Sequence, residues 1–289
     1  MSASIDTGSS YSKVYRLIEW RRYKEALEEA KALISEDPDD ADAYAVLAQV
    51  FLHMDRYADA LKWTARSLTL DPENKVAWYV RACAFYESGD FRHLPELIDD
   101  ALRVDPREPM YFYLQANLSL RKKKFQDART WISQALAIQS ENALFLSFAA
   151  YAEALMNDDE RSRELERQAL RLNDESPHVF LHLGWAASQR SEHDKEAEFM
   201  KNAVRLDPEN GQIRAEYLES LQRGYLLYRI FLYPIKLVRR LKPWQIFLAW
   251  FVFFIVFRPL LFLMIILYVA SHWGTKLLVR YKVFGWGRR

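Results

Sequence analysis

The chain of 289 residues has little of what most enzyme sites require. It contains one cysteine, Cys83, and eight glycines, and it has no Gly-rich phosphate loop and no HExxH, GxSxG or CxxC motif. A single cysteine excludes an internal disulfide and is typical of a reducing compartment. We therefore expect neither an enzyme nor a bound cofactor, and no small-molecule substrate.

Histidines are also scarce, at six. His178 and His182 are four residues apart, so a helix would place both on one face, as it does with pairs of metal ligands. The sequence shows no third ligand, and two ligands rarely hold a metal. The sequence therefore predicts no metal site, and we interpret the two histidines as polar residues of a binding surface.

What the chain does have is a regular interval of 34 residues. Four Asp-Pro pairs fall on it, and Ser140 and Asp174 hold the two remaining positions. The pairs are Asp37-Pro38, Asp71-Pro72, Asp105-Pro106 and Asp207-Pro208. A fixed period of this length predicts a solenoid of stacked helix pairs, in which each unit packs on its neighbours.

Positions inside each unit repeat as well. Where two helices should cross, the residue is always small: Ala48, Ala82, Ala116, Ala150 and Gly184. Where the second helix should begin, four units have an aromatic residue: Tyr23, Tyr57, Phe91 and Phe125. Over residues 7–210 these columns resemble the tetratricopeptide repeat (TPR) family, which implies an all-α, right-handed solenoid of about six helix-turn-helix repeats. C-terminal membrane helices are expected to follow it.

Two departures from the pattern lead to local expectations. Pro95 falls in the second helix of the third unit, so we expect that helix to start late, with Pro95 near its first position. Asp159 and His193 replace the aromatic residue in the fifth and sixth units, so we expect looser turns there.

The resemblance also implies a concave surface lined by the first helix of each unit. Its positions hold an aromatic stripe with apolar and polar neighbours. The predicted partner-binding residues are Tyr79, Tyr86, Met110, Tyr113, Asn117, Leu144, Tyr151, His178 and Trp185. Such a surface suits an amphipathic helix or an extended peptide. The alternatives are that these rings serve packing between repeats, or that the chain's own tail covers them.

The C-terminal part differs in charge and hydropathy. From Gly211 onward 13 Lys/Arg stand against 2 Asp/Glu, whereas the preceding residues have 27 against 37. Residues 244–270 are apolar except for Arg258, which precedes Pro259. Trp244 and Trp273 flank this run as interfacial anchors, and bases precede it at Arg239, Arg240 and Lys242. The run predicts a membrane insertion and not a capping helix docked on the repeats.

The topology of this insertion stays open. A single tilted span would place Arg258 near the bilayer centre, at a free-energy cost of at least about 2.5–3.5 kcal/mol. A re-entrant hairpin broken at Arg258-Pro259 would leave both basic flanks in the cytosol. The expected segments are a disordered N-terminus at 1–8, the solenoid at 9–210, a capping helix and basic interfacial stretch at 211–243, the membrane segment at 244–273 and a basic tail at 274–289.

Together these features predict a membrane-anchored TPR adaptor that binds a protein or peptide at the cytosolic face of a membrane, the bacterial inner membrane. The basic tail would contact lipid, and nucleic acid is not the expected partner, because the bases flank an apolar run. The acidic solenoid would be repelled by anionic lipid. Two alternatives are an integral subunit of a secretion, envelope or transport machine that uses Arg258 and the tail, and a membrane-shaping hairpin protein.

Overall fold

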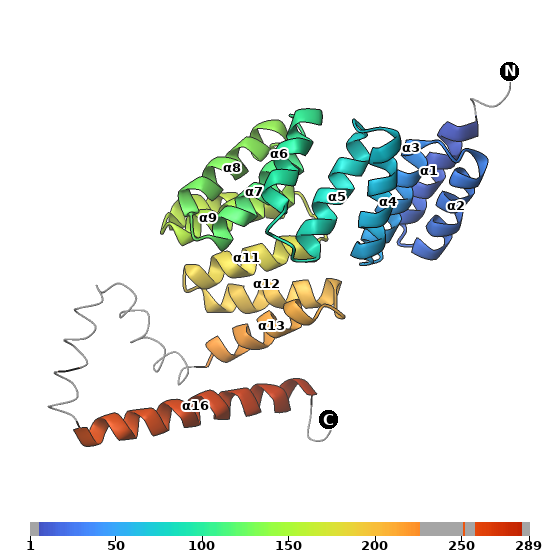
Figure 1. Cartoon of the computed structure of the whole chain (residues 1–289). Coiled ribbons are helices and arrows are strands. Elements are labelled where there is room, and N and C mark those ends of the chain that lie inside the picture. Colours follow the sequence, from blue (N-terminus) through green and yellow to red (C-terminus); the bar gives the residue numbers. More distant parts are fainter. Residues whose placement is uncertain (1–5, 226–250, 252–257, 285–289) are drawn as a thin grey trace. The chain divides into compact units, whose positions relative to one another are not determined.

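The computed structural model describes residues 6–225, 251 and 258–284, and its described elements are all α-helices (Figure 1). They form six antiparallel hairpins, one for each predicted repeat. The hairpins are α1 (Asp6–Glu19) with α2 (Tyr23–Glu36), α3 (Ala41–His53) with α4 (Tyr57–Leu70), α5 (Lys75–Glu87) with α6 (Leu94–Val104), α7 (Pro109–Arg121) with α8 (Phe125–Ile138), α9 (Ala143–Leu155) with α10 (Asp159–Arg171), and α11 (Pro177–Gln189) with α12 (His193–Leu206). Two further helices are α13 (Gly211–Arg223) and α16 (Arg258–Phe284).

The chain divides into two compact units, an N-terminal unit (Met1–Ser140) and a C-terminal unit (Glu141–Arg289). In each of them the two helices of a hairpin pack together, and successive first helices also contact one another, as α3 contacts α5 and α9 contacts α11. The first helices therefore form one layer of each unit, which is the layer that the predicted binding residues belong to.

The residue before each first helix follows the 34-residue interval and acts as its N-cap. Asp40, Asn74, Glu108, Asn142 and Asn210 accept hydrogen bonds from backbone N–H groups in the first turn of the helix that follows. These bonds satisfy donors that a helix start leaves unpaired. The repeated acidic or amide residue therefore marks the start of α3, α5, α7, α9 and α13, whereas Ser176 before α11 makes no such side-chain bond.

The turns inside the hairpins share one geometry. Each contains a residue with positive φ, again spaced by 34: Arg21, Asp55, Gly89, Lys123, Asn157 and Ser191. The next residue donates its N–H to a carbonyl five positions back, at 2.8–3.1 Å in the first four hairpins and at 3.0 and 2.9 Å in the fifth and sixth. The expectation of looser turns at Asp159 and His193 was therefore wrong, because the backbone bonds define the turn without an aromatic residue.

The core consists of small residues at helix crossings and larger side chains between them. At Gly184 a Cβ atom would lie 2.6 Å from the Cε of Met200, which is fully buried, so a larger residue would force the Met200 side chain to shift. α6 begins at Leu94 with Pro95 in its first turn, as predicted. At the other end, α1 begins at Asp6, three residues before the expected start of the solenoid, with an acidic residue where the helix dipole favours one.

α13 lies in the segment predicted to cap the solenoid. Its Ile213 is 1% exposed and packs with Leu181, Met200 and Ala203 of the sixth hairpin. Residues 226–250, and with them most of the predicted interfacial segment, lie outside the described part of the chain. α16 continues eleven residues beyond the predicted end of the membrane segment at Trp273, to Phe284.

Candidate functional site

In the N-terminal unit, five of the predicted binding residues come together on α5 and α7. The Tyr86 hydroxyl donates to Asn117 Oδ1 at 3.0 Å, and Asn117 Nδ2 donates to the Tyr113 carbonyl at 2.9 Å. Tyr113 is only 7% exposed, whereas Tyr86 and Asn117 are half-buried. Burial raises the pKa of Tyr86 to about 12. The half-buried members are thus held by hydrogen bonds, and Tyr113 belongs to the core.

Tyr79 lies in the same layer, and its ring faces the thiol of Cys83. The charge of that thiol and burial together raise the pKa of Tyr79, and burial raises the pKa of Cys83 to about 12. Both groups are therefore neutral at physiological pH. Met110 is half-buried at the start of α7. This part of the layer is an apolar surface with hydroxyl groups at its margin.

In the C-terminal unit, Tyr151 on α9 and Trp185 on α11 form a tilted ring pair with centroids 5.5 Å apart. His182 lies on the buried side of this pair, 5.7 Å from the Trp185 ring and 5.4 Å from Phe148. Burial lowers the pKa of His182 to about 3, so its ring is neutral. Tyr151 and Trp185 remain half-buried, while His182 is 4% exposed.

The remaining predicted residues of this unit frame the ring pair. Leu144 is half-buried at the start of α9, and His178 is exposed at the start of α11. Among the described residues no group of His, Cys, Asp and Glu has the arrangement of a metal site. From α13, Glu216 approaches the rings, since burial raises its pKa and a hydrogen bond with Trp185 opposes that rise. Sequence reasoning did not include Glu216, although it extends the same layer.

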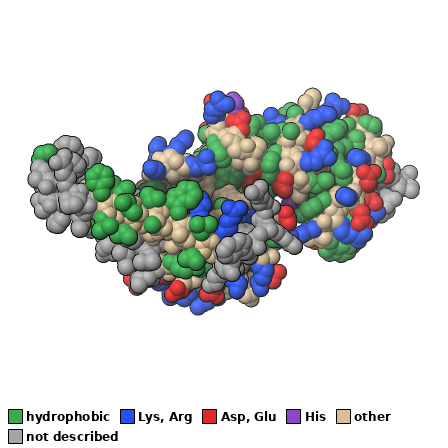
Figure 2. Space-filling model, turned by 90° about the horizontal axis from the view of Figure 1, so that it is seen from below, with side chains coloured by type: hydrophobic (Ala, Val, Ile, Leu, Met, Phe, Trp, Pro, Cys, Tyr) green, Lys and Arg blue, Asp and Glu red, His purple; other side chains and the backbone are tan. Residues whose placement is uncertain are grey.

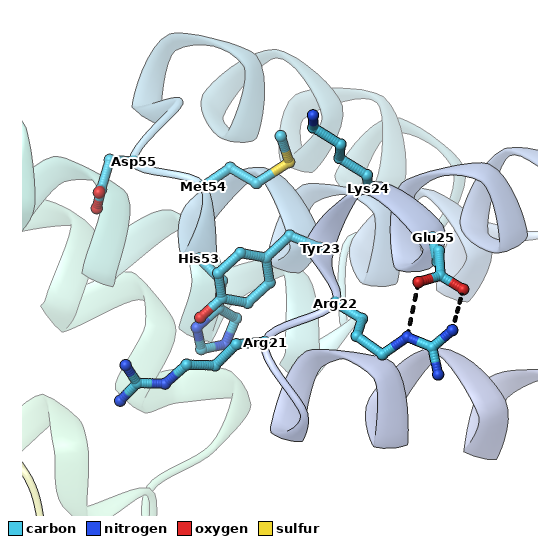
Figure 3. A pocket seen from close by; sticks show the side chains of 8 residues that line it. All are labelled: Arg21, Arg22, Tyr23, Lys24, Glu25, His53, Met54 and Asp55. Atoms are coloured by element: carbon cyan, nitrogen blue, oxygen red, sulfur yellow. Dashed lines mark hydrogen bonds and ion pairs between the residues drawn. The ribbon is translucent and has the colours of Figure 1, made fainter.

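A hollow of about 570 Å³ opens between the first two hairpin turns of the N-terminal unit (Figure 3). The Tyr23 ring stacks on His53, with centroids 6.0 Å apart and planes 11° apart. Arg22 makes two hydrogen bonds to Glu25, while the Arg21 side chain points away from Arg22 (Figure 3). The sequence analysis did not identify this hollow, because its residues come from two turns 34 positions apart.

Sequence reasoning also missed a buried charge network in the C-terminal unit. Arg190 has no exposed side-chain surface and pairs with Glu166 and Glu192. Glu196, on α12, pairs with Arg223 of α13. The signal was present, because the columns of Glu166 and Glu196 hold small or apolar residues elsewhere. In the other units the column of Glu166 holds Ala30, Thr64, Ile98, Ile132 and Met200. The column of Glu196 holds Ala26, Ala60, Leu94, Ala128 and Ser162.

The predicted membrane residues are partly described. Arg239, Arg240, Lys242 and Trp244 lie outside the described residues, and Arg258 and Pro259 form the first turn of α16. Trp273 is 61% exposed in the middle of α16, and the Lys276 ammonium group lies 5.9 Å from its ring centroid. Within the described ranges, Phe262–Arg280 is long and apolar enough to cross a membrane. The view from below shows apolar side chains exposed along α16 (Figure 2).

Comparisons with known proteins agree with this architecture. Two models of the tetratricopeptide repeat match residues 17–82 and 79–143. No curated protein matches the sequence of the chain significantly. Solved structures also resemble it in fold, and the three described next share 12–18% sequence identity with it.

Three of these structures are informative. A chain of the APC/C Cut9–Hcn1 hetero-tetramer aligns at 14% identity and a TM-score of 0.61, over 75% of this chain and 41% of its own length. The present chain thus spans less than half of that relative. PilF of Pseudomonas aeruginosa aligns at 18% identity and a TM-score of 0.56, over 73% of this chain and 95% of its own length. A TPR protein of Parabacteroides merdae aligns at 12% identity and a TM-score of 0.58, over 76% and 86%.

The chain is therefore a tetratricopeptide repeat protein with a solenoid of helix hairpins. TPR solenoids are interaction scaffolds that bind protein or peptide partners.

Proposed function

We propose that this protein is a membrane-anchored adaptor, which binds a protein or peptide on the layer of first helices and holds it at the cytosolic face of a membrane. The observation that carries the proposal is the half-buried pair of Tyr151 and Trp185, next to the acidic Glu216. Rigid aromatic rings at a polar margin are typical of binding hot spots. The occupant would be a segment with an apolar anchor and a basic or amide group.

α16 supports the membrane part of the proposal. Its apolar stretch of 19 residues is about 28 Å long, close to the thickness of the hydrocarbon core, and its large side chains are exposed. Anchoring confines the bound partner near the membrane and so raises its effective concentration there. The basic residues flanking this segment favour the cytosolic side.

Site-specific crosslinking tests the binding surface. A photoreactive phenylalanine analogue at Trp185, in the full chain in native membranes, should crosslink to a protein partner, and Tyr151→Ala in the same chain should abolish the crosslink. The matched control places the analogue at Trp131 on α8, whose ring also pairs with an aromatic residue, at 6.2 Å from Phe112. Equal crosslinking from both positions, with both chains folded, would contradict the assignment to the layer of first helices.

Membrane anchoring needs its own measurement. Ile266→Arg with Val269→Arg adds two charges to exposed positions of α16, at about 2.5–3.5 kcal/mol each for insertion into the bilayer. We expect this variant to be released from membranes by alkaline carbonate, whereas the control Ile266→Leu with Val269→Leu should remain. Retention of the arginine variant would show that α16 is not the anchor.

A further inference from the structure

We propose that the N-terminal unit docks on an anionic phospholipid surface through the edge formed by the turns inside its four hairpins. This inference rests on the membrane anchoring proposed above and specifies which part of the unit meets the membrane. We call this edge, residues 20–22, 54–56, 88–93 and 122–124, the basic edge. The connections between hairpins, residues 37–40, 71–74 and 105–108, form the acidic edge.

The two edges carry opposite charge. The basic edge has seven cations and two anions: Arg21, Arg22, Arg56, Arg92, Lys122, Lys123 and Lys124, with Asp55 and Asp90. The acidic edge has seven anions and one cation: Asp37, Asp39, Asp40, Asp71, Glu73, Asp105 and Glu108, with Arg107. Because hairpins alternate direction, all turns of one kind lie at one end of the helices. The net negative charge of the repeats therefore hides a division between two edges.

Contacts join the turns of the basic edge in two pairs, the first with the second and the third with the fourth. The hollow between the first two turns joins Arg21 and Asp55 in one surface, with the stack of Tyr23 on His53 at its wall (Figure 3). The third and fourth turns are joined by Arg121, whose guanidinium lies 3.7 Å from the centroid of the Phe91 ring. The Tyr57 hydroxyl donates to Asp55 at 2.9 Å, which fixes the second turn.

Contacts also join the three connections of the acidic edge. The Asn74 side chain donates to Asp42 at 2.6 Å, and the Lys75 ammonium group lies 3.3 Å from the Asp105 carboxylate. The Tyr11 hydroxyl donates to Asp40 at the first connection. Two acids of this edge, Asp40 and Asp105, thus have partners within the unit itself.

Of the seven cations of the basic edge, Arg22, Arg56 and Lys124 pair with acids of the second helices, and the other four have no ion-pair partner in the described part of the chain. Across residues 6–225, Arg21, Arg92, Lys122 and Lys123 make no ion pair, and all four are exposed. Trp20 stands among them with 62% of its surface exposed. An exposed tryptophan beside arginines is the pattern of a membrane interface, where the ring enters the headgroup layer and the bases meet phosphates.

Backbone geometry gives a second, independent reason. Arg21 and Lys123 occupy the positive-φ position of their turns, at 58° and 57°. Glycine and asparagine adopt this conformation at lower free energy, and the third and fifth turns use Gly89 and Asn157. Two of the four turns of the N-terminal unit thus place a long cation where the backbone favours a small residue. A requirement for positive charge at this edge accounts for that choice.

The C-terminal unit lacks this feature within its described residues. Its two hairpin turns, residues 156–158 and 190–192, carry Asp158, Arg190 and Glu192, and Arg190 is buried in ion pairs. The basic edge is therefore a property of the N-terminal unit and not of the repeat itself.

A lipid surface fits this edge better than a nucleic acid does. Single-stranded nucleic acid requires several exposed aromatic rings on which bases stack, and among the described residues of the edge Trp20 is the one strongly exposed Phe, Tyr or Trp. Separated cations at the ends of four hairpins match an extended anionic plane. Each cation near such a surface adds a similar amount, about 1 kcal/mol, to the binding free energy. The proposed α16 anchor would tether the N-terminal unit to the same membrane.

The test uses the full chain with one fluorophore, inserted in lipid nanodiscs. In a Cys83→Ser background, Ser88→Cys labels the basic edge and Ser35→Cys, at the end of α2, labels the opposite end of the helices. Both serines are exposed. Nanodiscs contain headgroup nitroxide lipid in either neutral phosphatidylcholine or a mixture with phosphatidylglycerol. We expect quenching at position 88 in the anionic discs, little in the neutral ones, and none at position 35 in either.

Charge variants then identify the cations. Lys122→Gln with Lys123→Gln and Lys124→Gln should reduce the docked-to-free ratio at least about tenfold. The matched control removes the same charge from exposed cations on second helices, by Lys31→Gln, Arg103→Gln and Lys201→Gln, and should leave the ratio unchanged. Docking should also disappear at about 1 M salt, where the Debye length is about 3 Å.

Three results would overturn the proposal. The first is equal quenching at positions 88 and 35, and the second is no quenching at either position in a chain that has inserted. The third is a change in the fluorescence of position 88 on adding an acidic peptide or DNA, with no change on adding the bilayer. A chain that fails to insert would refute the anchoring and not the edge. Flotation of that chain with preformed anionic and neutral vesicles would then measure the edge alone, and the lysine variant should still bind less.

Discussion

Arg190, which ends α11, forms a fully buried ion pair with Glu166 on α10, and its guanidinium also donates to Ser162. Glu192 lies 3.0 Å from the same guanidinium. Burial alone would raise the pKa of Glu192, but its hydrogen bonds with Arg190 and Arg163 outweigh burial and hold that pKa at about 2. One arginine therefore pairs with two carboxylates, whose second charge is balanced by Lys195 and Arg163.

Removing this arginine should destabilise the protein strongly. Arg190→Ala leaves Glu166 buried with only Lys195, at 3.1 Å, as a partner, so we expect a loss of about 3–5 kcal/mol in the free energy of unfolding. The measurement is urea unfolding of the full chain in detergent. Arg161→Ala is the control, because its pair with Glu164 is exposed and should contribute less than about 1 kcal/mol. Similar losses in both variants would refute the special role of Arg190.

His182 predicts a pH dependence of stability. Its pKa of about 3 in the folded protein is below the ordinary 6.5, so the unfolded chain binds the proton more readily. Stability is therefore complete above about pH 6.5 and falls as the pH decreases toward 3. At pH 5 the loss is about 2 kcal/mol.

His182→Gln isolates this effect through the slope of unfolding free energy against pH. We expect the slope between pH 7 and 5 to decrease, even if the variant is less stable at every pH. His178→Gln, at an exposed position four residues earlier, removes only the smaller, charge-based cause of the low pKa of His182 and should change the slope less. An unchanged slope in His182→Gln would mean that the ring is protonated or reaches solvent in the folded state.

Much of this architecture follows from the 34-residue interval, because capping, crossing and turn positions each depend on local backbone geometry that repeats. Pro95 is an example, since its missing N–H fits only a helix start. The expectation for the turns before Asp159 and His193 was wrong because backbone hydrogen bonds determine their shape. Such bonds do not depend on the residue type at any single repeat position.

The candidate site was harder to predict. The position of Tyr113 in the repeat places it in the layer of first helices. Its exposure, however, depends on how neighbouring side chains pack, which the sequence does not reveal, and only 7% of its surface is exposed. The buried acids Glu166 and Glu196 were detectable as charged outliers in apolar columns, whereas their arginine partners lie in columns that tolerate many residues. The two charged edges appear only when distant turns are brought together by the fold.

Two tyrosines of the N-terminal unit should respond oppositely to loss of the hydroxyl. The Tyr111 hydroxyl is buried and has no hydrogen-bond partner within the described residues, so Tyr111→Phe should stabilise the protein by about 1 kcal/mol. Tyr86 donates to Asn117 at 3.0 Å, so Tyr86→Phe should destabilise it by about 1 kcal/mol. Thermal unfolding of the two variants side by side provides the test, and destabilisation by Tyr111→Phe would indicate a partner for its hydroxyl.

The positive-φ position of the fourth hairpin turn gives a prediction that links stability to the basic edge. Lys123 has a φ of 57°, a conformation that costs about 1–2 kcal/mol for a residue with a Cβ atom and little for glycine. Lys123→Gly should therefore raise the free energy of unfolding by about 1 kcal/mol.

Lys122→Gly is the matched control, because Lys122 has a φ of −82°. Glycine has no advantage there and should lower stability by about 0.5–1 kcal/mol through the entropy of the unfolded chain. Both variants remove one cation from the basic edge, so binding to anionic vesicles should weaken equally in the two while their stabilities change in opposite directions. If Lys123→Gly were less stable than the original chain, the lysine would be supporting the fold, and the argument that its charge was retained for a surface would lose its basis.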